Sequence, residues 1–147
     1  MRVSTKGRYG LRVLLDVAMN QERGPVILRD IAKRQAISEK YLWQVINPLK
    51  GAGLVNSARG AHGGYTLAKE PAEISVLDVV STLEGPVSVV DCVEAPESCN
   101  RSSVCVTRGA WGEIEARLRE VMAKITLAEL MQRQRDFELG GSVNYVI

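Results

Sequence analysis

The sequence predicts a mainly α fold with a small β-hairpin wing, that is, a winged helix-turn-helix domain followed by a long dimerisation helix. Three observations predict this fold. Three segments with helical apolar spacing lie within residues 9–50, two short strand-like segments enclose a glycine-rich loop, and one long apolar stripe runs from 111 to 125. A length of 147 residues suits one compact domain with an extension.

The first three helices are expected over residues 9–19, from Leu28 onward and after Ser38. Ser38 is a good N-cap because its hydroxyl can accept a free amide hydrogen of the third helix. Pro48 should bend or shorten the last turn of that helix, since proline removes a backbone donor. The residues expected on the apolar faces are Leu11, Leu14, Leu15 and Ala18 in the first helix, Leu28, Ile31 and Ala32 in the second, and Leu42, Val45, Ile46 and Leu49 in the third.

A hairpin is expected from two short strands at residues 54–58 and 65–68. The loop between them, residues 59–64, is rich in glycine and has an arginine at its base. Further along, the segment from Ser75 to Asp78 resembles a capping box, which opens a fourth helix directed toward Leu83.

The rest of the chain divides into a cysteine-containing loop and a long helical segment. Residues 91–108 are polar, lack periodicity and contain every cysteine, so we expect them to be irregular. The apolar stripe consists of Trp111, Ile114, Leu118, Val121, Met122 and Ile125. The expected units are 1–85, the winged helix-turn-helix DNA-binding domain; 86–108, the cysteine-containing loop; 109–135, the dimerisation helices; and 136–147, a mobile tail.

The apolar stripe has two possible partners. It can pack against helices of the same chain, or against its copy in a second subunit. Winged helices that recognise operators are usually dimers, because two half-sites supply affinity that one module lacks. We therefore expect a homodimer.

The charge is divided unevenly along the chain. Residues 1–70 contain 12 basic and 5 acidic residues, a net charge of +7, whereas residues 71–147 contain 7 basic and 12 acidic residues, a net charge of −5. A basic half indicates a surface that faces a polyanion, and double-stranded DNA is the expected partner. No apolar run approaches the roughly 20 residues of a membrane span, and no signal-peptide core follows the basic start, so we expect a cytoplasmic protein without a membrane partner.

Candidate DNA contacts lie in the third helix, the hairpin loop and the N-terminal segment. If the third helix enters the major groove, its first turns face base edges, where glutamine can bind adenine. The candidates there are Ser38, Glu39, Lys40, Tyr41 and Gln44. Tyr41 can instead bind a phosphate or complete the core, and Trp43 can be buried, cover a thymine methyl group or lie at the rim. Phosphate contacts are expected from Arg2, Lys6, Arg8 and Lys50, a minor-groove contact from Arg59, and close backbone approach from the loop around His62.

The three cysteines form a C-x6-C-x5-C pattern at Cys92, Cys99 and Cys105. An odd number in a reducing compartment makes a disulfide framework a poor explanation. The spacing matches neither paired zinc knuckles nor the cysteine run of bacterial ferredoxins. It leaves iron–sulfur, zinc and thiol-redox chemistry open. We find no catalytic constellation and expect neither an enzyme nor a small-molecule substrate.

Several of these stretches together resemble the IscR-type regulators over about residues 1–135. The stretches are Met1-Arg2-Val3-Ser4-Thr5-Lys6-Gly7-Arg8-Tyr9, Ile37-Ser38-Glu39-Lys40-Tyr41-Leu42, Gly53-Leu54-Val55, Arg59-Gly60-Ala61-His62-Gly63-Gly64-Tyr65, and the cysteine triplet followed by Trp111. The resemblance implies a dimeric bacterial winged-helix transcription regulator. It also implies that Cys92, Cys99 and Cys105 hold an iron–sulfur cluster, expected to be [2Fe–2S], and that Ser38, Lys40, Tyr41, Gln44 and Arg59 contact DNA.

The sequence departs from these relatives at three positions. Trp43 replaces a glutamate that is frequent in the iron–sulfur assembly branch. Arg108 stands where those relatives place a fourth-ligand histidine, and a guanidinium cannot ligate. Arg8 stands where other members supply an acidic ligand.

The expected function is to sense iron–sulfur status and to control genes of cluster assembly, chiefly as a repressor. The alternative is a nitric-oxide or thiol/redox sensor on the same scaffold, with a [4Fe–4S] cluster or none. A small electron carrier is the third hypothesis, but it leaves the basic half unexplained.

Overall fold

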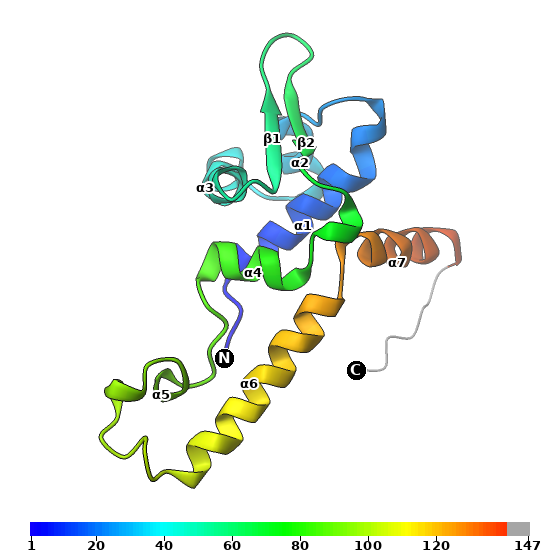
Figure 1. Cartoon of the computed structure of the whole chain (residues 1–147). Helices are drawn as coiled ribbons and strands as arrows, with labels where there is room; N and C mark the ends of the chain where they lie inside the picture. Colours follow the sequence, from blue (N-terminus) through cyan, green and yellow to red (C-terminus); the bar gives the residue numbers. More distant parts are fainter. Residues whose placement is uncertain (141–147) are drawn as a thin grey trace.

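The computed structural model describes residues 1–140 and has a mainly helical fold with one two-stranded antiparallel hairpin, as the sequence predicts. The elements are α1 (Thr5–Asn20), η1 (Gln21–Arg23), α2 (Leu28–Gln35), α3 (Glu39–Gly51), β1 (Val55–Ala58), β2 (Gly64–Leu67), η2 (Pro71–Glu73), α4 (Val76–Glu84), α5 (Asp91–Glu94), η3 (Pro96–Ser98), α6 (Val106–Lys124) and α7 (Leu127–Gly140) (Figure 1). Within this range no helix is long and apolar enough to cross a membrane.

Helix α1 runs through the centre of the molecule and begins four residues earlier than residue 9 (Figure 1). The Ser4 hydroxyl accepts a hydrogen bond from the amide of Gly7 at 3.3 Å and so caps the helix. Leu14 is fully buried, as expected for the predicted face. Val13 and Val17 are also fully buried, so the buried face is wider than the predicted stripe.

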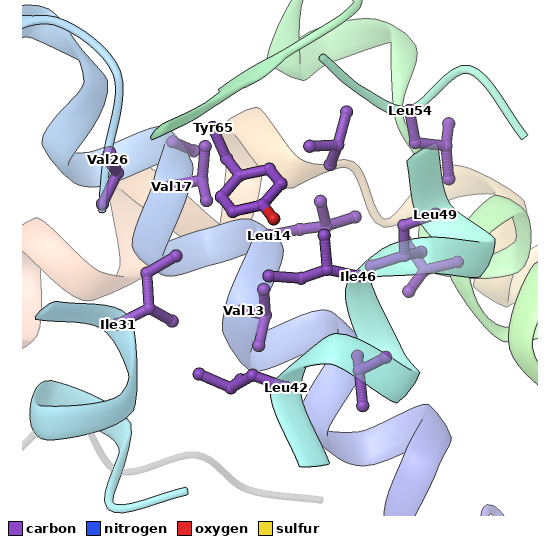
Figure 2. Close-up of a cluster of buried hydrophobic side chains, with 14 of the residues drawn as sticks. Val13, Leu14, Val17, Val26, Ile31, Leu42, Ile46, Leu49, Leu54 and Tyr65 are labelled. Atoms are coloured by element: carbon purple, nitrogen blue, oxygen red, sulfur yellow. The ribbon is translucent and has the colours of Figure 1, made fainter. Parts of the chain in front are cut away.

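Helix α3 follows the predicted pattern closely. Ser38 caps it by accepting a hydrogen bond from the amide of Tyr41 at 3.2 Å. All four predicted core residues are buried and pack with α1 and the hairpin in one cluster: Leu42, Val45, Ile46 and Leu49. Figure 2 labels Leu42, Ile46 and Leu49 in this cluster. Pro48 lies inside the helix, which continues for three more residues and ends at Gly51.

The hairpin pairs Val55 with Leu67 and Ala58 with Gly64 in an antiparallel register. Strand β2 is attached near the loop end of the hairpin to the segment before α2, because Val26 and Tyr65 exchange two backbone hydrogen bonds of 2.8 Å. This attachment fixes the wing relative to the helices.

A buried carboxylate joins α1 to the end of α2. Only 2% of the Asp16 side chain is exposed, and its oxygens accept hydrogen bonds from Nη2 and Nε of Arg34 at 2.7 and 2.9 Å and from Nε2 of Gln35 at 2.9 Å. The same hydrogen bonding raises the pKa of Arg34. Ala36 then adopts a left-handed conformation with φ 53°, and Ser38 starts α3 two residues later. The Asp16 network therefore fixes the turn that places α3.

Helix α4 opens with the predicted capping box. The amide of Asp78 donates to the Ser75 hydroxyl at 3.1 Å, and the amide of Ser75 donates to the Asp78 carboxylate at 2.8 Å. The carboxyl-terminal end of α4 lies against the start of α1.

The C-terminal part differs from the expectation in two respects. Residues 91–108 are not wholly irregular, because they contain α5, η3 and the first residues of α6. Helix α7 extends to Gly140, so the expected mobile tail from 136 is helical over its first five residues, and its remainder lies outside the described residues. Figure 1 shows α6 projecting away from the hairpin, with α5 beside its far end.

Candidate nucleic-acid interface and cysteine loop

The first turns of α3 present polar side chains to the surface. Ser38, Lys40 and Gln44 are exposed, as direct contact with DNA bases requires. Tyr41 is half-buried, and its ring meets that of Tyr9 edge to face at a centroid distance of 5.6 Å. Tyr41 therefore couples α3 to α1 and leaves only part of its surface for a ligand.

The hairpin and α3 enclose an open groove of about 490 Å³. Trp43, which is 51% exposed, lines it together with Lys50 and Arg59. The indole is therefore not a core residue. It lies on the same surface as two of the predicted basic contacts.

The wing loop carries Arg59 and His62, and both are exposed. Gly64 closes the loop with φ +154°, and a Cβ there would lie 2.6 Å from the carbonyl oxygen of Val26. Glycine is thus required at this position by both conformation and space. The loop extends beyond the helical body (Figure 1).

The N-terminal basic residues form a second group. Arg2 and Arg8 are exposed and line one shallow hollow of about 630 Å³, and Lys6 is half-buried. Arg8 also lies over the Tyr9 ring at 6.0 Å from its centroid. The structure thus places the predicted DNA contacts at three surfaces: the start of α3, the wing and the start of α1.

The three cysteines lie on one segment between α4 and α6. Cys92 is in α5 and half-buried, Cys99 follows η3 and is exposed, and Cys105 is the N-cap residue of α6. All three thiols are free. The Thr107 hydroxyl lies 3.1 Å from Sγ of Cys105, and this hydrogen bond, with one from the backbone of Arg108, lowers the pKa of the thiol.

Arg108 has a structural role in this segment. Its Nε donates to the carbonyl of Cys92 at 2.7 Å, and its Nη2 donates to the carbonyl of Val93 at 3.4 Å. The guanidinium therefore joins the first turn of α6 to α5. It also lines an open hollow of about 350 Å³ together with Cys99.

The donor chemistry of this segment fits an iron–sulfur cluster, because three free thiols are soft ligands that such clusters prefer. Their arrangement in this structure is open. Within residues 1–140, no three histidine, cysteine or acidic side chains are grouped to hold a metal ion.

The sequence did not identify Glu115, which holds the segment before the cysteines. Glu115 is buried on α6, and its carboxylate accepts a hydrogen bond from the amide of Val89 at 3.2 Å and pairs with Arg119 at 3.5 Å. The available signal was an acidic residue beside the apolar stripe, four positions after Trp111. Such a residue on a buried face must find a partner.

The family model that matches this chain is Rrf2, described as an iron-dependent transcriptional regulator, and it covers residues 3–133. Among curated relatives, protein rrf2 of Nitratidesulfovibrio vulgaris is 46% identical over 132 residues, which span 90% of this chain and 88% of that protein. The HTH-type transcriptional regulator IscR of Klebsiella pneumoniae is 40% identical over 141 residues, spanning 96% of this chain and 86% of that protein.

Two solved structures are similar over almost the whole chain. The global cysteine regulator CymR of B. subtilis is 39% identical with a TM-score of 0.77, covering 90% of this chain and 98% of that one. The IscR structure from T. potens is 38% identical with a TM-score of 0.78, covering 99% and 97% respectively.

Proposed function

The chain belongs to the Rrf2 family of transcriptional regulators, and from this premise we propose that it is a homodimeric, cluster-holding sensor of iron–sulfur status. DNA binding and transcription regulation, rather than catalysis, are the activities of this family. The proposal adds the cofactor, the regulated genes, the oligomer and the residues that touch DNA.

The proposed DNA-binding surface combines three groups of residues. The exposed start of α3 supplies Ser38, Lys40, Tyr41 and Gln44 to base edges. Arg59 and His62 of the wing and the basic residues Arg2, Lys6 and Arg8 would contact the backbone or minor groove. The net charge of +7 on residues 1–70 supports this assignment, since phosphate contacts dominate affinity for DNA.

The proposed cofactor is an iron–sulfur cluster held by Cys92, Cys99 and Cys105. The observation that carries this proposal is the position of three free thiols on one short segment, in a chain 40% identical to IscR. When bound, such a group supplies redox and ligand-exchange chemistry. Within this chain, Arg108 of α6 binds the Cys92 carbonyl, and Glu115 of α6 binds the Val89 amide just before the cysteines. A change in the cysteine segment would therefore shift α6, the proposed dimer helix. Genes of cluster assembly would be repressed, and some could be activated.

A thiol or nitric-oxide sensor is the second candidate, with a [4Fe–4S] cluster or none. Arg108 favours this candidate, because it stands where the resemblance implies a fourth protein ligand for a [2Fe–2S] cluster. A guanidinium cannot ligate iron, and here it binds the Cys92 carbonyl instead. The similarity to a cysteine regulator points the same way. Cys105 has a lowered pKa, which increases its thiolate fraction.

Anaerobic purification followed by iron and sulfide analysis and an absorption spectrum tests the proposal. We expect about two irons and two sulfides per chain with visible absorption, and neither in Cys92→Ala. Four irons and four sulfides per chain support the second candidate, and a colourless protein with reactive thiols supports its cluster-free form. Zinc in place of iron contradicts both.

A further inference from the structure

Glu84, the last residue of α4, contacts the first residues of α1. Its carboxylate Oε1 accepts a hydrogen bond from the backbone amide of Ser4, which lies 80 residues earlier in the chain. Ser4 is the N-cap residue of α1, and its own hydroxyl caps the amide of Gly7. Two acceptors from different parts of the chain therefore satisfy two of the free donors at this helix start.

Two glycines of α1 make room for this contact. A Cβ at Gly7 would lie 2.5 Å from Oε1 and 2.9 Å from Cδ of Glu84. A Cβ at Gly10 would lie 2.0 Å from Cδ1 of Leu83. Glycine lowers the stability of a helix interior, so two glycines on the face toward α4 indicate that α1 and α4 must approach closely there.

The charge pattern of α1 also calls for Glu84. Negative charges stabilise a helix N-terminus and positive charges destabilise it. The first turn of α1 contains no acidic residue, whereas Lys6 and Arg8 stand at its start. Glu84 supplies the missing negative charge from another element, which allows this helix start to remain basic.

The N-terminal residues lie along the end of α4. Met1 and Arg2 line a small hollow of about 190 Å³ together with Glu84 and Val87. The residues before α1 thus contact the chain that leaves α4 at Glu84. At Val89 this chain is held to α6 by the hydrogen bond to Glu115.

We propose that Glu84 is a positioning residue for operator recognition. By holding the Ser4 amide, it fixes the basic arm, Met1–Arg8, relative to α3, the helix proposed to contact base edges and here called the recognition helix. Phosphate contacts set the register of a protein on DNA, so a loose arm would retain its charge but lose its placement. This role rests on the proposed DNA-binding function.

The test compares two affinities at one salt concentration. One duplex is selected by the wild-type protein from a random-sequence pool, and the other is a duplex of unrelated sequence. Glu84→Ala should lower affinity for the selected duplex about 3–10-fold and leave the other unchanged, because a positioning defect removes specificity rather than charge. Glu84→Gln retains an acceptor oxygen and should keep more of the preference.

Gly7→Ala provides an independent variant. The new methyl group would displace the Glu84 carboxylate while improving helix propensity, so the preference should fall without a lower melting temperature. In the double variant Gly7→Ala with Glu84→Ala, the clash is absent. Its loss of preference for the selected duplex should equal the loss in Glu84→Ala alone. Glu22→Ala removes the same charge from exposed η1 and serves as the control.

This role is overturned if Glu84→Ala keeps its preference for the selected duplex. It is also overturned if the alanine and glutamine variants at Glu84 lose equal preference, or if the losses of preference add in the double variant. A wild-type protein that selects no duplex would instead overturn the proposed DNA-binding function, and this role with it.

Discussion

Arg59 is the basic residue most directly placed for a specific contact. It is exposed where β1 passes into the wing loop, and it lines the groove that also contains Trp43. Its position on a hairpin attached through Val26 and Tyr65 fixes its direction better than a free loop would.

Arg59→Ala should therefore weaken binding to the selected duplex by about 1–3 kcal/mol, the usual range for one base-directed arginine. Fluorescence anisotropy with selected and unrelated duplexes measures the effect. Arg23→Ala, an exposed arginine in η1, is the control. If both variants lose the same small amount, Arg59 contributes only general charge.

Arg108 stands where the resemblance to IscR-type regulators implies a fourth-ligand histidine, and in this structure its side chain binds backbone carbonyls. It donates to the Cys92 and Val93 carbonyls. Arg108→His should slow the decay of visible absorbance in air, because imidazole is a better iron ligand than the local oxygen donors. Arg108→Ala is the matched control, since it loses the same hydrogen bonds without adding a ligand. Equal decay in the histidine and alanine variants would show that the histidine does not ligate.

Local capping could be predicted at the residue scale, and distant capping could not. Ser38 and the Ser75–Asp78 box were readable because the hydroxyl and its amide lie three residues apart. Glu84 and Glu115 bind amides 80 and 26 residues away, and no local pattern reveals such pairs. The DNA-contact set is likewise a prediction, because exposure permits a contact without establishing one.

At the scale of elements, apolar spacing predicted α3 completely and α1 only in part. Helix α3 buries one stripe, whereas α1 is packed by α2, α3, α4, α7 and the hairpin, so residues on several faces become buried. Val13 and Val17 were missed for that reason. The short α5 lacks periodicity because four residues make scarcely one turn.

Gly64 is one of the glycines that the conformation of the wing requires. Gly64→Ala should lower the free energy of unfolding by about 1–3 kcal/mol, since it combines a strained φ of +154° with a contact at 2.6 Å to the Val26 carbonyl. It should also weaken DNA binding, because the hairpin must shift to relieve that contact. Thermal melting and anisotropy report the two effects. Gly51→Ala at the end of α3 meets open space and should lower neither stability nor DNA affinity.

At the scale of the whole molecule, the proposed DNA contacts of α3 and the hairpin lie in a different place from the cysteine segment. The hairpin and α3 lie at one end, whereas α5, which contains Cys92, and the start of α6, which Cys105 caps, lie at the other (Figure 1). The basic half predicts strongly salt-dependent DNA binding.

The double variant Lys6→Ala with Arg8→Ala should have lower affinity for the selected and the unrelated duplex alike. The slope of log affinity against log salt should flatten by about one to two units, one for each lost phosphate contact. Binding measured across a salt series gives the slope, with Lys33→Ala and Arg29→Ala on exposed α2 as the paired control. An unchanged slope would remove Lys6 and Arg8 from the phosphate contacts.

Helix α6 divides its surface between this chain and a proposed second copy. Met122 and Glu115 face the protein's own interior. Trp111, Ile114 and Val121 are 42%, 50% and 56% exposed, which leaves an apolar band along a helix that projects from the body. A second copy would bury this band against its own α6, and dimerisation would place two recognition helices on two half-sites.

Ile114→Glu with Val121→Glu should therefore yield a monomer, because two carboxylates cannot be buried without partners at such an interface. Sedimentation velocity measures the mass, and circular dichroism should show unchanged helix content, since neither side chain belongs to the protein's own core. Affinity for the selected duplex should fall at least tenfold, about 1.4 kcal/mol, while affinity for a single half-site should persist. Ala123→Glu, at an exposed position of α6 away from the band, should remain dimeric. A double variant that still sediments as a dimer would place the subunit interface elsewhere, and the exposed band on α6 would then need another partner.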